Sequence, residues 1–253
     1  MNPKVKFEVA SVRHIMLPIN DFLNPEEGWD WSRHILDNYP ELDKLLKNVK
    51  GRSQRGKIAE DFFEKFVRAN KNLLEKKASR FQQEWNKINN RYMVALSEVL
   101  EIRWKKTDKE IRAFVSPNPI CPRYIKKRIF DVYYLSSKEW MKSVAAHEIL
   151  HFLYFEKWKK IFPKTPERHF DAPHLEWQLS EMVPLSILSD KRLQKILPHK
   201  PKVYTEYQAL KIKGKPLLDH IAEFYEQSED FEDFLRKSWN FVKENKKAIG
   251  GAK

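Results

Sequence analysis

The residues with the clearest chemical potential are two histidines and a glutamate in the stretch His147-Glu148-Ile149-Leu150-His151. Residues at positions i and i+4 lie on one face of a helix, so both imidazoles can bind a single cation. A glutamate at the second position can take a proton from a water activated by that cation. The pattern predicts a zinc site in which His147 and His151 are ligands and Glu148 is the general base.

The residues around this motif favour a helix from Ser136 to Lys160. Apolar side chains recur at helical spacing, no Gly or Pro interrupts the segment, and its last turn is rich in lysine. Ser136 or Ser137 can cap the first turn, and Pro163 follows the end. The alternative is an ordinary core helix with two buried histidines, in which a buried Glu148 would be costly without a metal.

A catalytic zinc site needs a third protein ligand, and four downstream residues are candidates. Glu181 is favoured, because it lies on a second apolar helix beginning near His174, and a helical hairpin can return its carboxylate to the imidazoles. Glu176 lies about 140° around the same helix, so the two glutamates cannot both face the metal. His169 or His174 would instead give a three-histidine site.

The composition and net charge limit the kinds of protein that this chain can be. The chain has 253 residues, of which 42% are hydrophobic, and this is ample for a packed core. The 48 Lys and Arg residues exceed the 35 Asp and Glu residues and give a net charge of +13. The basic residues are spread among acidic ones, which favours a solubilising surface, although an acidic substrate or nucleic acid remains an alternative partner.

The sequence also predicts where in the cell the protein is located. The one cysteine excludes an intramolecular disulfide, and the N-terminal residues lack the apolar stretch of a signal peptide. No apolar run approaches the length needed to span a bilayer. We therefore expect a cytoplasmic protein without a membrane anchor.

The remaining pattern predicts an α+β fold that is mostly helical. Residues 30–46 favour short helices, the segment from Lys57 to Val99 favours two long helices, and two or more helices follow residue 200. Three segments rich in β-branched and aromatic residues are expected to form a small three-stranded sheet before the motif helix: Glu101–Trp104, Ile111–Ser116 and Ile129–Leu135. We expect an N-terminal helical extension (1–82), a catalytic core (83–200) and a C-terminal helical segment (201–253).

The order of sheet, His-Glu-x-x-His helix and glutamate helix resembles that of the gluzincins, in particular the small cores called minigluzincins and the thermolysin-like enzymes. The resemblance covers about half to two-thirds of the chain, from about Gln83 onward. It implies a zincin-like core and a zinc metallopeptidase acting on a peptide or protein substrate, with His147, His151 and Glu181 as ligands. It also implies that the substrate adds to an edge strand, here Ile111–Ser116 or Ile129–Leu135.

One position departs from the thermolysin-like pattern, in which an aspartate follows the ligand glutamate four residues on, because Leu185 stands there. Two other functions remain open. A SprT-like protease would take a third histidine and act near DNA. A binding or scaffold protein would hold a structural zinc without hydrolysis.

Overall fold

The computed structural model describes residues 2–24, 31–199 and 201–250. The protein is mostly helical with a small mixed sheet, as the predicted α+β class requires. Its contacts form two compact units. The sheet unit comprises described residues within 4–87 and 110–145, and the helical unit comprises those within 1–3, 88–109 and 146–253. The three-part division into 1–82, 83–200 and 201–253 stays a prediction, since contacts alone do not show which segments fold independently.

The sheet unit contains a four-stranded sheet in the order β1-β2-β4-β3. The first three of these strands in space are parallel, and β3 pairs with β4 in the antiparallel sense. The elements of this unit are β1 (Lys4–Val9), α1 (Val12–Phe22), α2 (Ser32–Leu36), α3 (Pro40–Leu46), α4 (Arg52–Ala69), α5 (Lys71–Asn86), β2 (Glu110–Ser116), β3 (Arg123–Tyr124), the 3-10 turn η1 (Ile125–Lys127) and β4 (Ile129–Tyr133). The first residues of α7 (Lys138–Ile161) also belong to it.

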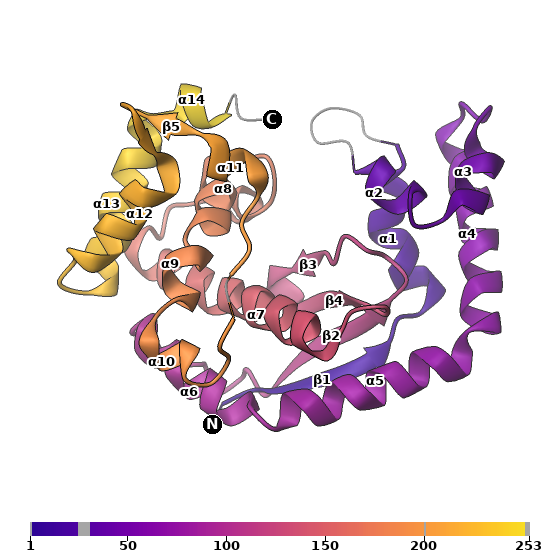
Figure 1. The fold of residues 1–253 in the computed structure, drawn as a ribbon, viewed down its shortest axis with the longest axis horizontal. Helices are drawn as coiled ribbons and strands as arrows, with labels where there is room; N and C mark the ends of the chain where they lie inside the picture. Colours follow the sequence, from indigo (N-terminus) through magenta and orange to yellow (C-terminus); the bar gives the residue numbers. More distant parts are fainter. Residues whose placement is uncertain (1, 25–30, 200, 251–253) are drawn as a thin grey trace. The chain divides into compact units, whose positions relative to one another are not determined.

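Helix α5 covers one face of this sheet and runs alongside β1 (Figure 1). Its buried residues recur at helical spacing, so they form one apolar stripe: Leu74, Ala78, Phe81 and Trp85. Phe81 meets Phe7 of β1 edge to face, with ring centroids 6.1 Å apart. Gln82 of α5 also serves the outer edge of β1, since its side chain accepts from the Phe7 amide and donates to the Val5 carbonyl, both at 2.9 Å.

A buried polar pair joins α1 to the other face of the sheet. His14 Nε2 lies 2.7 Å from Oδ1 of Asp131, whose side chain is fully buried in β4. The His14 ring also stacks at a tilt on Phe114, at a centroid distance of 4.2 Å. Burial raises the pKa of Asp131, while the contact with His14 lowers it. The pair thus gives a polar contact to a carboxyl group that would otherwise be costly to bury.

The helical unit carries the remainder of α7, from Ala146 onward, and the following elements: α6 (Asn89–Val99), η2 (Glu167–Phe170), α8 (Leu175–Met182), α9 (Pro184–Leu188), α10 (Lys191–Gln194), α11 (Thr205–Ala209), the short hairpin β5 (Lys211–Ile212) and β6 (Lys215–Pro216), α12 (Leu217–Glu226), α13 (Phe231–Glu244) and α14 (Lys246–Gly250). The expectation of two or more C-terminal helices is confirmed. No helix within the described residues is both long and apolar enough to cross a membrane.

The predicted strand Glu101–Trp104 is wrong. The segment ends α6 instead: Glu101 adopts a positive φ of 51°, and the Ile102 amide donates back to the Ser97 carbonyl at 3.1 Å. This is the hydrogen bond of a helix-terminating motif. Ile102 and Trp104 are apolar because they are buried beside the helix end, and not because they pair in a sheet.

The sheet also differs from the prediction in its first strand and its edges. Lys4–Val9 forms the strand β1, although we expected a helical extension over residues 1–82. The predicted strand Ile111–Ser116 is confirmed as β2, but it is not an edge strand, because β2 lies between β1 and β4. The other expected edge, in β4, is paired by β3 only at Ile129 and Phe130.

The predicted helices are correct in kind but too long. The segment Lys57–Val99 contains parts of three helices, because α4 ends and α5 begins at Asn70. The Asn70 side chain donates to the Phe66 carbonyl at 2.9 Å, which competes with continuation of the helix. The glutamate helix is similarly divided, and Pro184 is the first residue of α9.

An ion-pair cluster in the sheet unit predicts how stability depends on acid. Lys142 Nζ lies 2.8 Å from Glu84 Oε2, and Lys87 pairs with the same carboxylate. These hydrogen bonds lower the pKa of Glu84 from 4.5 to about 2. The resulting stabilisation is complete above pH 4.5 and is lost as the pH falls towards 2. We expect the Glu84→Gln variant to lose less free energy of unfolding than wild type over this interval, measured by urea denaturation.

The control for this experiment is Glu75→Gln, which removes a more exposed carboxylate on the same helix, 4.0 Å from Lys71. Its acid dependence should follow that of wild type. Equal acid dependence in wild type and Glu84→Gln would contradict the assignment.

Candidate metal centre

The motif helix is α7, and its observed bounds agree closely with the predicted ones. Ser137 caps it, because its Oγ accepts from the Trp140 amide at 3.0 Å. Of the two cap residues that the sequence allowed, Ser136 and Ser137, the structure therefore selects Ser137. The helix continues through the motif to Ile161, so His147 and His151 lie one turn apart on it.

The middle of α7 is buried on all sides. Every residue from Ala145 to Phe155 is less than a tenth exposed except His147. The Tyr92 hydroxyl of α6 donates to the Ala146 carbonyl at 2.6 Å, which fastens the helix one residue before the motif. The His151 ring stacks towards Phe155, which itself stacks on Phe170 at 4.2 Å between centroids. Packing therefore restricts where the two imidazoles can point.

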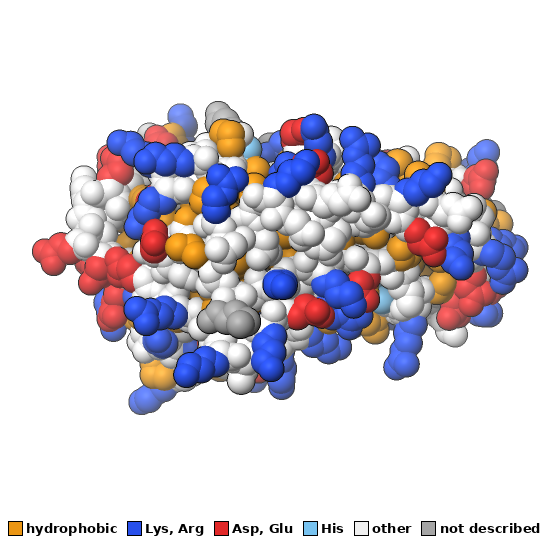
Figure 2. Space-filling view, turned by 90° about the horizontal axis from the view of Figure 1, so that it is seen from below, with side chains coloured by type: hydrophobic (Ala, Val, Ile, Leu, Met, Phe, Trp, Pro, Cys, Tyr) orange, Lys and Arg blue, Asp and Glu red, His pale blue; other side chains and the backbone are white. Residues whose placement is uncertain are grey.

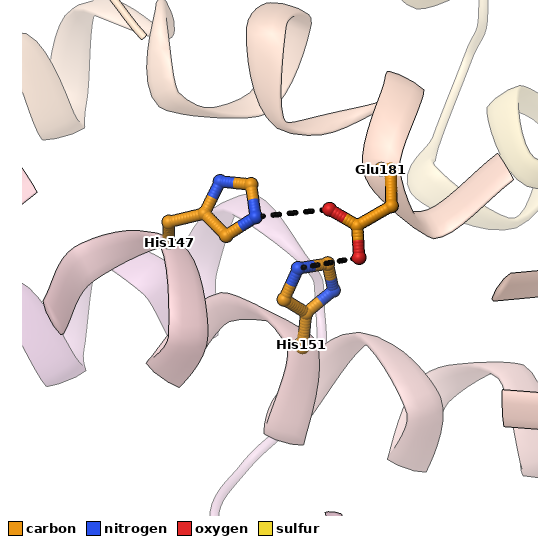
Figure 3. Close-up of side chains that lie close together, drawn as sticks. All are labelled: His147, His151 and Glu181. Atoms are coloured by element: carbon orange, nitrogen blue, oxygen red, sulfur yellow. Dashed lines mark hydrogen bonds and ion pairs between the residues drawn. The ribbon is translucent and has the colours of Figure 1, made fainter. Parts of the chain in front are cut away.

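Glu181 of α8 meets both imidazoles, as Figure 3 shows. Its Oε2 lies 3.2 Å from His147 Nε2, and its Oε1 lies 3.6 Å from His151 Nε2. The two rings have centroids 4.6 Å apart and an interplanar angle of 72°. One potential ligand atom from each residue falls within 4.8 Å of the others. The geometry thus brings together the three residues that the sequence proposed as ligands.

The donor set fits zinc. Two imidazole nitrogens and one carboxylate oxygen are the three-ligand combination of a catalytic zinc site that keeps one position for water or substrate. Atoms about 2.0–2.1 Å from one tetrahedral ion lie roughly 3.4 Å from each other. The separations of 3.2 Å from His147 to one Glu181 oxygen and 3.6 Å from His151 to the other oxygen are close to this value. A cation at this point would also compensate the buried charge of Glu181, whose side chain is 2% exposed.

The competing third ligands occupy a different arrangement. His169 Nδ1 lies 2.9 Å from Glu176 Oε1, and the His169 and His174 rings stack at a centroid distance of 4.3 Å. Among the described residues, the only group of three or more His, Cys, Asp or Glu with ligand atoms in metal-binding range is His147, His151 and Glu181. The geometry therefore favours Glu181 over these three alternatives.

Glu148 follows His147 directly and is 8% exposed. Successive helical residues point about 100° apart, so its carboxylate leaves the helix beside the two imidazoles and not between them. A carboxylate in this position could exchange protons with a water on a bound ion, which stays a prediction. This position is the one that the sequence assigned to the general base.

The structure also shows supports that the sequence did not reveal. Tyr92 and Phe170 hold α7 and the His151 ring from distant parts of the chain. Neither residue belongs to a motif, and their contacts depend on how helices pack. The only sequence signal was their aromatic character, which they share with many core residues.

Comparisons with known proteins identify no relative: no protein family, no curated protein and no solved structure matches the chain. The chemistry of the site must therefore be argued from its own residues.

The ligand assignment makes a direct prediction. Removing the Glu181 carboxylate leaves two imidazoles, which are too few to hold the ion tightly, so Glu181→Ala should lose zinc. Glu176→Ala, which removes a carboxylate from the same helix, should retain it. The measurement is zinc stoichiometry by mass spectrometry of purified, reconstituted protein. Zinc retained by Glu181→Ala and lost from Glu176→Ala would show that the other carboxylate is the ligand.

Proposed function

We propose that this protein is a zinc-dependent metallopeptidase of the gluzincin type, in which His147, His151 and Glu181 bind the ion. The single observation that carries the proposal is the convergence of these three residues, with ligand atoms within 4.8 Å of one another, directly beside Glu148. Two histidines and a carboxylate are the ligand set of thermolysin-like catalytic zinc. The proposed substrate is a peptide or protein.

The proposed chemistry divides between the ion and the chain. When bound, zinc acts as a Lewis acid that makes a water acidic near neutral pH and polarises the scissile carbonyl. Glu148 accepts the proton from the attacking water and then delivers it to the leaving amine. His147, His151 and Glu181 hold their positions because α7 and α8 are packed on buried faces.

The order of elements supports a zincin-like core within the broader α+β fold. Two parallel strands, β2 and β4, precede the motif helix, and α8 follows with the third ligand. Leu185 occupies the place of the aspartate found in thermolysin-like enzymes, so the groups around the ligands must differ from that subgroup. Minigluzincins are the form of the family that this core resembles most in extent.

The third ligand argues against the SprT-like alternative. That reading requires His169 or His174 at the ion, and these residues instead pair with Glu176 and with each other. The positive charge supplies no contrary argument, because Figure 2 shows Asp and Glu side chains among the Lys and Arg side chains of the face in view.

Replacing the general base separates zinc binding from turnover. We expect Glu148→Gln to keep one zinc per chain and to lose about 10²- to 10⁴-fold in kcat, the usual contribution of a general acid-base group. The measurement is hydrolysis of a broad library of fluorescence-quenched peptides, followed by kinetics on a responsive member.

The matched control is Glu156→Gln, on the same helix, where the carboxylate pairs with Lys105 at 2.5 Å and lies about two turns after Glu148. It should hydrolyse peptides at the wild-type rate. Wild-type turnover in Glu148→Gln would contradict the role of this residue. Tight zinc with no hydrolysis of any library member would favour the binding or scaffold protein instead.

A further inference from the structure

Tyr207 of α11 is a buried polar residue that the proposed mechanism does not use. Its side chain is fully buried, and its hydroxyl has no hydrogen-bond partner within the described part of the chain. A buried hydroxyl without a partner costs free energy, so such a group calls for a specific explanation. Two polar residues near it in the chain differ from Tyr207: Tyr204 is only partly buried, and His220 donates its Nε2 proton to the Ile212 carbonyl at 3.1 Å.

Aromatic contacts place α11 against the face of α8 that carries the third ligand. Tyr204 packs on Trp177 of α8 at a centroid distance of 6.1 Å, and Tyr207 packs edge to face on Tyr204 at 5.9 Å. Trp177 and Glu181 are four residues apart and therefore lie on one face of α8. These contacts bring the start of α11, and with it Tyr207, to the part of α8 that carries Trp177 and Glu181.

The charges around Tyr207 keep it protonated. Burial raises the pKa of its hydroxyl, and the negative charges of Glu181 and Glu206 raise it further. Both causes favour the protonated hydroxyl, which can donate a hydrogen bond. Glu206 precedes Tyr207 on the same short helix and points about 100° away from it, which leaves Glu181 as the carboxylate on a neighbouring element that the hydroxyl can face.

Burial also decides what Tyr207 can touch. At the three-residue site the His147 side chain is 20% exposed, whereas those of His151 and Glu181 are at most 2% exposed. A substrate arrives from solvent and so from the His147 side. A fully buried tyrosine is therefore better placed to act on the buried carboxylate of Glu181 than on a substrate that arrives beside His147.

We propose that Tyr207 is a positioning residue for the metal centre, whose hydroxyl donates a hydrogen bond to the Glu181 carboxylate when zinc is bound. Carboxylate ligands are usually held by such outer partners, and losing one typically costs 10- to 100-fold in metal affinity. The inference rests on the proposed zinc site but not on peptidase activity. It also supplies a support for the ligands in a chain where Leu185 replaces the thermolysin-like aspartate.

The test compares two tyrosines that differ mainly in the carboxylate they face. Tyr154 of α7 is also fully buried, and its hydroxyl also has no hydrogen-bond partner among the described residues. Burial raises the pKa of Tyr154, and the negative charge of Glu176, not Glu181, raises it further. Tyr207→Phe and Tyr154→Phe therefore each remove one buried hydroxyl and keep the ring. The zinc dissociation constant is measured by competition with a chromophoric chelator.

We expect Tyr207→Phe to weaken zinc binding by about 10- to 100-fold and Tyr154→Phe to match wild type. The visible absorption spectrum of the Co²⁺-substituted protein gives a second readout, since it reports ligand geometry and should change only in Tyr207→Phe. Thermal midpoints of the metal-free variants separate a loss of fold from a loss of zinc affinity.

The outcomes distinguish this inference from the proposed function. Zinc affinity that is unchanged in Tyr207→Phe, or reduced equally in both variants, overturns the role of Tyr207 and leaves the peptidase proposal intact. Weak zinc binding in Tyr207→Phe alone supports the role even if no peptide is hydrolysed, in which case only the peptidase proposal fails. Wild-type protein that binds no zinc overturns both.

Discussion

The carboxylate of Glu181 lies between the imidazoles of His147 and His151 with almost no exposure to water. Removing an ionised carboxylate from water costs several kcal/mol unless charges or hydrogen bonds compensate it. The helical unit meets this cost by directing two imidazoles at one acid from a neighbouring helix. A cation bound by all three groups would offset this desolvation cost more fully. The same cation is what the proposed chemistry needs, so stability and function favour an ion at the same point.

That coincidence depends on α7 being held without freedom to rotate. A helix buried all round has no polar face to keep in water, so neighbouring groups must define its orientation. Tyr92 bonds to its backbone, and Phe155 and Phe170 support the His151 ring. Only His147 retains access to solvent. Among the three residues of the site, His147 is therefore the one that solvent reaches.

Much of the candidate site was predictable from sequence because its geometry is local. The spacing of His147 and His151 fixes their common face once a helix forms, and Glu181 stood out as a charge on an apolar helix. The sheet was less predictable: β1 pairs in parallel with β2, about 100 residues away, and such partners leave no local signal. Glu101–Trp104 has the composition of a strand because burial, and not pairing, selects apolar residues there. Tyr207 carried no distinguishing pattern, since its role depends on the packing of α11 on α8.

The side chain of Gln82 satisfies the edge of β1 in the way a further strand would, with one donor and one acceptor directed at the backbone of Val5 and Phe7. Exposed sheet edges promote self-association, because their unpaired amides and carbonyls can bind another chain. A glutamine on a covering helix gives these groups partners without extending the sheet. The Phe7 amide and the Val5 carbonyl are thereby occupied by a single side-chain amide and are not available to pair with another chain.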